Sequence, residues 1–391
     1  MPGDAMVDAN PPQRPPMGWK QSLVYALLPV ILAFAVLEAA ARIVEIWRPP
    51  ITVDLGQGFG PESRLFVPKQ GHPATMVTHP DKTLAFRNQA FERRKPQGTM
   101  RVVALGGSSV NYLDYEFSVL KERLEAALAP RFTNVEIINC GGLSYGSHRL
   151  VILAAEVIAY EPDLVLIYSG HNEFEEIQQL ELADLRAVPI QRALSHSALF
   201  RFIRDQFADR RIAELEEDRD QRNLATSVPD ASKAWMYRFS EEEITERMTA
   251  FRTNLGRIIE LCREHHVPVI IGTVPSNLIK PSLPGKDGHR YQEAEDLFGR
   301  GEFERGLAIA REVLRTSSPR HQSSDEENAV IRAVASEYGV PLADVEAAVV
   351  EAEPHHVPGE TLFSDHCHLN PAGNEILRRV YEAEILRLFR E

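Results

Sequence analysis

The residues best suited to nucleophilic catalysis are two adjacent serines and an Asp-x-x-His pair far along the chain. The serines are Ser108 and Ser109, and the pair is Asp365 and His368. A serine hydroxyl becomes a strong nucleophile when an imidazole takes its proton and a carboxylate fixes the tautomer of that imidazole. We therefore predict that Ser108 is the nucleophile, His368 its general base and Asp365 the partner of His368. Ser109 is the alternative nucleophile.

Attack of a serine on an acyl carbon produces an oxyanion, so the site also needs hydrogen-bond donors. Each good donor lowers the barrier by ~2.7–4 kcal/mol. We predict three donors: the N–H of Ser108, the N–H of Gly141 and the side-chain amide of Asn172. Each also has an ordinary interpretation, because Ser108 can cap a helix, Gly141 can permit a positive φ and Asn172 can cap a turn. The catalytic interpretation depends on their occurrence together.

The elements that position these residues are short apolar runs, several of which end in glycine-containing polar turns. The runs predict five strands, at Val102–Leu105, Val135–Asn139, Leu164–Tyr168, Val267–Val274 and Val340–Asp344. Helical apolar spacing separates them, and this alternation predicts a mostly parallel sheet covered on both faces. The fold class is α/β, a three-layer α/β/α sandwich with helical insertions and an N-terminal transmembrane helix. Ligands bind at the carboxyl edge of such sheets, where the loops after the first three strands meet.

The order of these site residues resembles that of the SGNH (GDSL-like) hydrolase family. Gly106-Gly107-Ser108 stands where the family has Gly-Asp-Ser, and Asn139-Cys140-Gly141 matches the block that carries the oxyanion glycine. Gly170-His171-Asn172-Glu173 matches Gly-x-Asn-Asp, and Asp365-His-Cys-His368 matches Asp-x-x-His. The resemblance covers roughly residues 100–175 and 265–390. The chain departs from the family pattern at Gly107 and Glu173, each of which replaces Asp.

The resemblance implies ester hydrolysis or acyl transfer through a seryl intermediate, with no cofactor and no metal. It implies the roles given above for Ser108, His368 and Asp365, with Gly141 and Asn172 in the oxyanion hole. The N-terminal apolar span, the Gly-Gly-Ser-Ser form and a tetratricopeptide-like helical insert also resemble a bacterial membrane-anchored branch.

The apolar span runs from Leu23 to Ala41, with one charge at Glu38. It is just long enough to cross a hydrocarbon core of about 30 Å. Residue types found at membrane interfaces flank it, namely Trp19, Lys20, Arg42, Trp47 and Arg48. We predict a single-pass anchor in a bacterial inner membrane, with the catalytic domain on the periplasmic or outer side. The positive-inside rule does not decide the orientation, and a buried helix of a soluble protein is the alternative.

The composition shifts along the chain predict its organisation. We expect a disordered tail at 1–18, the anchor at 19–48, an extended lead-in at 49–100 and a hydrolase domain at 101–391. Two helical insertions interrupt that domain, at about 176–248 and 283–320. The first carries Leu199, Phe200, Ile203 and Phe207 on one helical face with arginines nearby, which fits a membrane-surface helix or a domain helix with a solvated face. The second predicts two helices hinged at Gly301.

Composition and charge narrow the choice of partners and cofactors. The chain has 391 residues and a formal net charge of -13, which argues against a nucleic-acid partner. Its three cysteines, Cys140, Cys262 and Cys367, form neither a zinc pattern nor a disulfide framework. A metal site at His366, Cys367 and His368 is a minor alternative, because adjacent residues cannot easily face one ion. A redox link between Cys140 and Cys367 is the alternative to simple space-filling.

These features together predict a membrane-anchored serine esterase or O-acyl transferase that acts on an ester of a glycan, a lipid or a small molecule. The alternative is a catalytically degenerate scaffold whose helical insert binds a partner protein. A third interpretation is a soluble enzyme with a buried N-terminus.

Overall fold

The computed structural model describes residues 18–48, 64–83, 85–174, 176, 194, 197–203, 206, 240–283, 286–317 and 322–390. The predicted tail up to residue 17, the start of the predicted lead-in and most of the insertion predicted at 176–248 lie outside these residues. The chain divides into two compact units, one from 1–51 and 189–211 and the other from 52–188 and 212–391.

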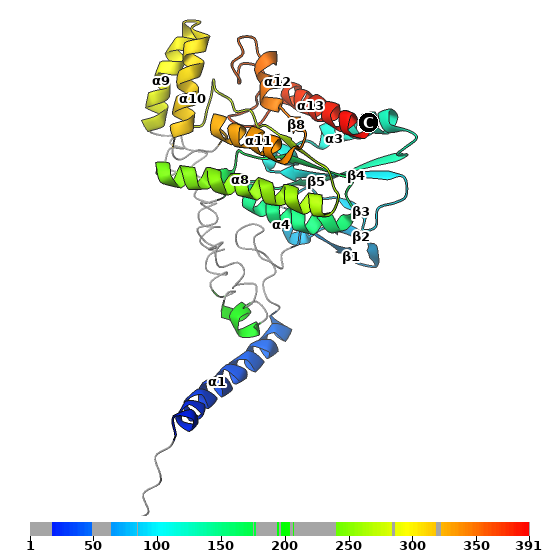
Figure 1. The fold of residues 1–391 in the computed structure, drawn as a ribbon, viewed down its shortest axis with the longest axis vertical. Coiled ribbons are helices and arrows are strands. Elements are labelled where there is room, and N and C mark those ends of the chain that lie inside the picture. The colour runs from blue at the N-terminus through cyan, green and yellow to red at the C-terminus, as the bar shows by residue number, and fades with distance from the viewer. Residues whose placement is uncertain are drawn as a thin grey trace, which may run out of the picture. The chain divides into compact units, whose positions relative to one another are not determined.

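The larger unit is built on a parallel five-stranded sheet in the order β5-β4-β6-β7-β8 (Figure 1). Its strands are β4 (Thr99–Gly106), β5 (Asn134–Gly141), β6 (Leu164–Tyr168), β7 (Val269–Gly272) and β8 (Leu342–Ala343). All five lie where apolar runs predict them. In this strand order the direction of winding reverses between β4 and β6, and ligands bind outside the carboxyl ends of the strands at such a point. Gly106 pairs with Tyr168 across these two strands, so their following loops start side by side.

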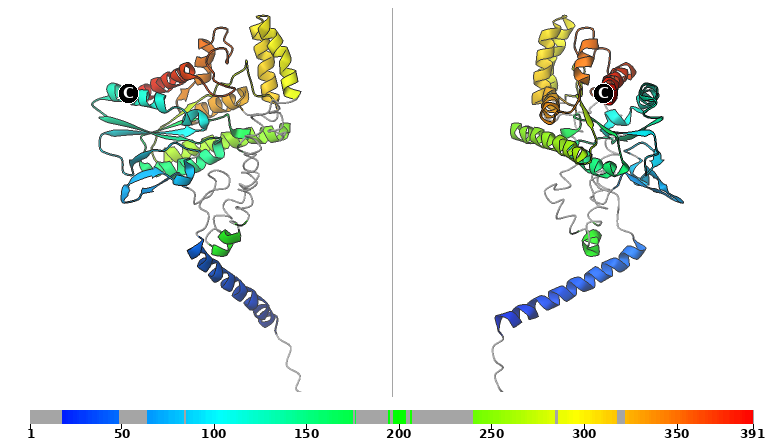
Figure 2. Two further views of the ribbon diagram at one scale, coloured as in Figure 1. Left: turned by 180° about the vertical axis from the view of Figure 1, so that it is seen from behind. Right: turned by 45° about the vertical axis from the view of Figure 1, so that its right-hand side comes forward.

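Helices cover both faces of the sheet, which confirms the α/β sandwich. Figures 1 and 2 show two groups of helices on opposite faces. One face carries α3 (Asp114–Leu128), α12 (Val345–Ala352) and α13 (Pro371–Arg390), and the other carries α4 (Ser147–Val157), α8 (Glu241–Glu264) and α11 (Asp325–Tyr338). β4 and β6 are buried along their whole length, as expected for strands that helices cover on both sides. The core therefore lies directly beneath the loops that the sequence assigns to the site.

A second, antiparallel sheet precedes the first, and the sequence analysis does not predict it. It consists of β1 (Phe66–Lys69), β2 (His72–Thr78) and β3 (Ala90–Glu92). A cluster of three aromatic rings packs beneath it, with Phe66 and Phe91 4.8 Å apart and Phe91 and Tyr160 5.2 Å apart. The buried guanidinium of Arg101 also bonds the carbonyl of Glu92 at 2.7 Å. These contacts fasten the segment before β4 onto the main domain.

A pair of helices, α9 (Lys286–Gly299) and α10 (Phe303–Thr316), follows β7 with Gly301 at the turn between them. The pair has a small apolar core of its own, which includes Tyr291, Ala294, Ala310 and Leu314. The helices and their hinge are where the sequence predicts them. A role of this pair in binding a partner protein stays a prediction.

The smaller unit contains α1 (Trp19–Trp47), the only helix among the described residues that is long and apolar enough to cross a membrane. Every side chain from Leu23 to Leu37 is exposed. Exposure of so many large apolar groups is costly in water and favourable in lipid.

Candidate active site

The turn that carries the predicted nucleophile lies at the end of β4. The strand ends at Gly106, and the short helix α2 (Ser108–Asn111) begins one residue after Gly107. A Cβ atom at position 107 would overlap the side-chain amide of Asn172. Glycine at this position therefore allows the side-chain amide of Asn172 to approach the nucleophile turn closely.

Three of the predicted residues form a continuous hydrogen-bonded chain. Nε2 of His368 lies 2.7 Å from Oγ of Ser108, and Nδ1 of His368 lies 2.7 Å from Oδ2 of Asp365. Ser108 and Asp365 are joined through one imidazole although they are far apart in the sequence. Ser109 has no such bond to His368 among the described contacts and instead lines a recess beside it. The arrangement favours Ser108 over Ser109 as the group that loses a proton.

The loop that holds Asp365 and His368 is fixed from several sides. An antiparallel bridge joins Phe363 to Leu369, and the N–H of Ser364 donates to the carbonyl of His368 at 2.9 Å. Nδ2 of Asn277, in the loop after β7, donates to the carbonyl of Asp365 at 2.9 Å. The imidazole therefore comes from a short, tied loop and not from a free segment.

Asp365 is held in its charged form. Its Oδ1 accepts the N–H groups of Cys367 at 2.9 Å and His368 at 2.7 Å, while Oδ2 faces the imidazole. Burial alone raises the pKa of Asp365, but these three hydrogen bonds outweigh burial and hold the pKa well below its usual value. An ionised carboxylate at Nδ1 keeps Nε2 free to accept the serine proton.

The three predicted oxyanion donors differ in availability. The N–H of Ser108 has no acceptor within the part of the chain that the structure describes. Nδ2 of Asn172 donates to the carbonyl of Tyr145 at 3.0 Å, but an amide has two hydrogens and one remains. The N–H of Gly141 donates its only hydrogen to Oδ1 of Asn139 at 3.0 Å. That bond has to open before Gly141 can bind an oxyanion.

A glycine at position 141 is also required by the packing of β5 against α2. A Cβ atom there would overlap the backbone of Asn111 in α2. Two asparagine side chains bind the backbone of Gly141. Oδ1 of Asn139 accepts its N–H, and Nδ2 of Asn111 donates to its carbonyl at 2.8 Å. Gly141 thus packs the end of β5 against the nucleophile helix.

Two buried glutamates after Asn172 hold the start of α4 in place, a role that the sequence does not predict for either of them. Glu173 accepts the N–H of Ser147 at 2.8 Å, and Glu176 accepts the N–H of His148 at 3.0 Å. Both carboxylates therefore lie at the N-terminal end of α4, where the helix leaves N–H groups unpaired. Arg247 of α8 pairs with Glu173 at 2.7 Å. A signal in the sequence is the Glu-x-x-Glu spacing directly after Asn172.

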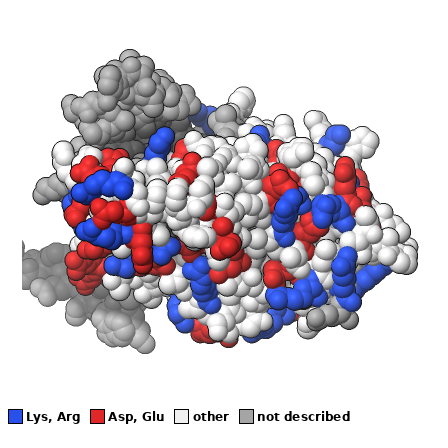
Figure 3. Space-filling model, turned by 90° about the horizontal axis from the view of Figure 1, so that it is seen from above, with Lys and Arg blue, Asp and Glu red and all other residues white. Residues whose placement is uncertain are grey.

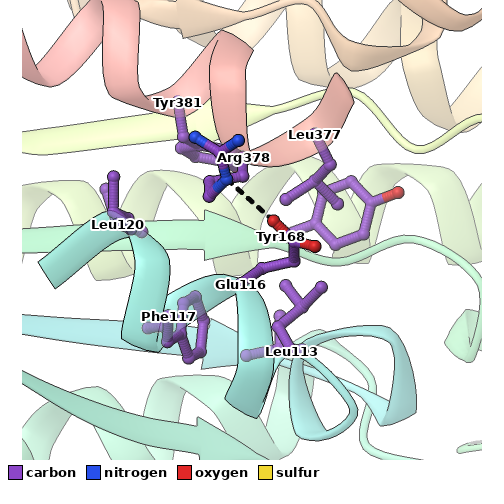
Figure 4. A pocket seen from close by; sticks show the side chains of 11 residues that line it. Leu113, Glu116, Phe117, Leu120, Tyr168, Leu377, Arg378 and Tyr381 are labelled. Carbon is purple, nitrogen blue, oxygen red and sulfur yellow. Dashed lines mark hydrogen bonds and ion pairs between the residues drawn. The ribbon is translucent and has the colours of Figure 1, made fainter. Parts of the chain in front are cut away.

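A small recess lies beside the imidazole and is too narrow for more than about one water molecule. The ring of Tyr112 forms one wall, 5.2 Å from the ring of His368, and half of Tyr112 is exposed. Tyr168 and Leu377 line this recess and also line an apolar cavity between the sheet, α3 and α13 (Figure 4). Glu116 and Arg378 form an ion pair at 2.8 Å in that cavity. The cavity has about 20 Å³ of free volume, which does not hold an acyl chain unless side chains move.

One group of ligand-type atoms could bind a metal. Asp365, Cys367 and His368 present such atoms within 4.8 Å of one another. Both ring nitrogens of His368 are already engaged, so a metal would have to displace Ser108 or Asp365 from the imidazole. These residues fit the serine chain better than a metal. Cys140 and Cys367 are both buried, and neither forms a disulfide.

The face of the molecule in Figure 3 carries interleaved basic and acidic side chains, separated by uncharged surface.

The sequence itself matches a known family over most of its length. Residues 104–376 match the GDSL-like lipase/acylhydrolase family. The chain belongs to this family. It is therefore an acylhydrolase, an enzyme that hydrolyses esters, as the resemblance predicts. No curated protein gives a significant sequence match to this acylhydrolase.

Several solved structures resemble the acylhydrolase. The acetyl xylan esterase AlAXEase is 12% identical with a TM-score of 0.40, covering 73% of this chain and 100% of that one. The acetylxylan esterase Axe2 of Geobacillus stearothermophilus is 14% identical with a TM-score of 0.38, covering 73% and 94%. A GDSL-like lipase of Bacteroides thetaiotaomicron is 13% identical with a TM-score of 0.38, covering 74% and 88%. Similarity of this degree does not bear on the substrate.

Proposed function

We propose that this acylhydrolase is a membrane-anchored serine esterase or O-acyl transferase, with Ser108 as nucleophile, His368 as general base and Asp365 as its orienting partner. The observation that supports it is the unbroken chain of two 2.7 Å contacts from Asp365 through His368 to Ser108. A geometry of this kind is what proton transfer from a serine hydroxyl requires.

In the first half-reaction, Oγ of Ser108 attacks the carbonyl carbon of the ester while its proton moves to Nε2 of His368. The carbonyl oxygen becomes an oxyanion. Asp365, held ionised, stabilises the imidazolium through Nδ1. Collapse of the tetrahedral intermediate breaks the bond to the leaving alkoxide, which takes the proton from Nε2. The product is an acyl ester on Ser108 and the free alcohol.

The oxyanion would be held first by the N–H of Ser108 and the second amide hydrogen of Asn172. The N–H of Ser108, which has no acceptor among the described residues, and the packing of Asn172 against Gly107 support this choice. Gly141 joins them only if its bond to Asn139 opens when substrate binds.

The second half-reaction decides between hydrolysis and transfer. Water or an acceptor alcohol gives a proton to Nε2 of His368 and attacks the acyl carbon, and Ser108 leaves with that proton. Water yields a carboxylic acid, and an alcohol yields a new ester. The proposed substrate is an acyl ester of a glycan, a lipid or a small molecule.

Residues 19–48 are proposed as a single-pass anchor, with the hydrolase domain at 101–391 on the outer side of a bacterial inner membrane. The support is the exposed apolar surface of α1 between Leu23 and Leu37. Extraction of the full chain from membranes tests the anchor. Release by detergent and retention in high salt are expected, whereas release by salt alone contradicts it.

The catalytic assignment is tested with a panel of acetyl, butyryl and longer acyl esters, with and without acceptor sugars. The amount of free carboxylic acid released measures hydrolysis. Mass spectrometry of the acceptor sugar detects the acyl group and measures transfer. We expect Ser108→Ala to abolish both products and Ser109→Ala to retain them. Turnover that survives Ser108→Ala contradicts the proposed nucleophile.

A further inference from the structure

The last part of α1 differs from the rest of the helix because one stripe of it is covered. The stripe consists of Glu38, Ala41 and Glu45, spaced so that they lie on one helical face. Ala41 is 5% exposed, while the preceding side chains from Leu23 to Leu37 are all exposed. Residues 197–203, here called the docked segment, bind both glutamates of this stripe.

The docked segment holds Glu38 through three hydrogen bonds. The hydroxyl of Ser197 donates to Oε2 at 2.7 Å, and the N–H groups of Ala198 and Leu199 donate to the two oxygens at 2.9 and 3.0 Å. Arg42, one turn further along α1, pairs with Glu38 at 2.9 Å. A carboxylate within an apolar span is costly in lipid unless such partners satisfy it.

A second anchor point lies two turns further along the same stripe. Arg201 binds both oxygens of Glu45, with distances of 2.8 and 2.7 Å. A planar, bidentate pair of this kind fixes orientation as well as position. Two contacts on one stripe of α1 define how the docked segment lies along the helix.

The docked segment also exposes apolar side chains next to an apolar helix. Phe202 is 37% exposed and Ile203 is 47% exposed, and Leu194 nearby is 44% exposed. Apart from Tyr112 and Tyr115, every large apolar side chain exposed by the described part of the chain lies in α1 or in this neighbourhood. Exposed apolar groups gathered in this way mark a contact with lipid or protein, and their continuity with α1 favours lipid.

The length of α1 places this contact at the membrane surface. Glu38 stands near the end of the apolar span Leu23–Ala41, so when this span crosses a hydrocarbon core of about 30 Å, Glu38 lies within about one helical turn of its edge. Glu38 then lies at the boundary with the headgroups. The helix beyond it, which ends in exposed Ile46 and Trp47, lies in the interfacial layer where aromatic residues concentrate.

We propose that the docked segment is a second membrane contact, a short interfacial element that Glu38 and Glu45 fasten to α1 and that places Phe202 and Ile203 in the lipid. It rests on the proposed anchoring of α1. The binding partner is the surface of the bilayer. The segment adds an interfacial contact beside the transmembrane helix, at the point where the chain leaves the membrane.

The experiment uses single cysteine variants of the full chain, labelled with an environment-sensitive fluorophore and reconstituted in phosphatidylcholine–phosphatidylglycerol vesicles at low protein density. Ile203→Cys is the test position, Leu32→Cys reports the anchor and Glu293→Cys in α9 is the exposed control. The native cysteines are buried, and the labelled wild type gives their background.

We expect blue-shifted emission at position 203 and quenching by lipids with a shallow nitroxide, whereas position 32 is quenched by a deep nitroxide. Emission at 203 equal to that at 293, without quenching, overturns the proposal whatever position 32 shows. A shift that grows with protein density and resists lipid quenching also overturns it, because a second protein then covers the segment. An aqueous signal at position 32 alone contradicts only the anchor.

The two fastening contacts are tested by charge reversal. Arg201→Glu should reduce the quenching at position 203 several-fold without changing position 32, and Glu45→Arg added to it should restore the quenching. Quenching that Arg201→Glu leaves unchanged contradicts the fastening. If the double variant stays as low as Arg201→Glu, the pairing with Glu45 is wrong.

Discussion

Gly107 and Asn172 are packed so closely that any side chain at position 107 would occupy the place of the Asn172 amide. One residue precedes the proposed nucleophile, and the other is a proposed oxyanion donor from the loop after the neighbouring strand. In this chain, the glycine at position 107 thus leaves the space that the Asn172 amide occupies.

Gly107→Ala tests this relationship. We expect kcat to fall by about 10²-fold or more, the loss typical of removing one oxyanion donor, because the added methyl group displaces Asn172. KM should change much less. Gly299→Ala is the matched control, since nothing lies within 4 Å of a Cβ at that position. Equal kcat values for the two variants contradict the role of Gly107.

Asp365→Asn should lower kcat by roughly 10³-fold or more, because an amide at Nδ1 favours the wrong imidazole tautomer. A matched control is Glu360→Gln, which neutralises a second carboxylate–imidazole pair, 2.7 Å from His355. That pair does not contact Ser108, so activity should persist. The kcat of each variant is measured with one ester at a fixed pH. A loss shared equally by the two variants indicates a general effect on the fold.

His148 predicts a pH dependence of stability. Burial and the adjacent Arg247 lower the pKa of His148 from 6.5 to about 4. The unfolded chain therefore binds a proton more readily than the folded chain between these values. The free energy of unfolding should fall by up to about 3 kcal/mol as pH drops from 6.5 to 4, and the loss should end below pH 4.

Urea unfolding of the wild type and of His148→Gln at several pH values measures this contribution. Glutamine does not titrate, so the difference between the two proteins should shrink as pH falls. A difference that stays constant from pH 7 to pH 4 rules out the assigned role of His148.

Tyr112→Ala should raise KM several-fold while kcat changes little, because its ring forms an exposed wall beside His368 and contacts whatever binds there. Tyr112→Phe should behave as the wild type if the ring face is what matters. Tyr115→Ala serves as a control, since Tyr115 is 75% exposed and no ring contact with His368 involves it. A fall in kcat at constant KM would instead place Tyr112 in the chemical step.

Much of this architecture can be predicted from the sequence. The strands β4 and β6 are continuous apolar runs, and only burial on both faces makes such runs stable. Their strand ends place Ser108 and Asn172 on one edge, and the Asp-x-x-His spacing places Asp365 beside His368. These inferences need only local patterns and the rule that parallel strands share a carboxyl edge.

Other features depend on contacts that local patterns do not contain. Nothing near Gly141 in the sequence shows that Asn139 already takes its hydrogen, because that depends on how the β5 turn folds. Glu173 reads as a substitution for Asp until its partner Ser147 is seen in space. The small sheet β1–β3 has short strands of mixed polarity, which give no period long enough to recognise.

The assignment of Ser108 as nucleophile is tested most directly by labelling the full chain in membranes with a fluorophosphonate and then mapping the modified residue by peptide analysis. We expect one adduct, on Ser108, which disappears in Ser108→Ala, persists in Ser109→Ala and forms far more slowly in His368→Ala. An adduct mapped to Ser109, or labelling that survives Ser108→Ala, contradicts it.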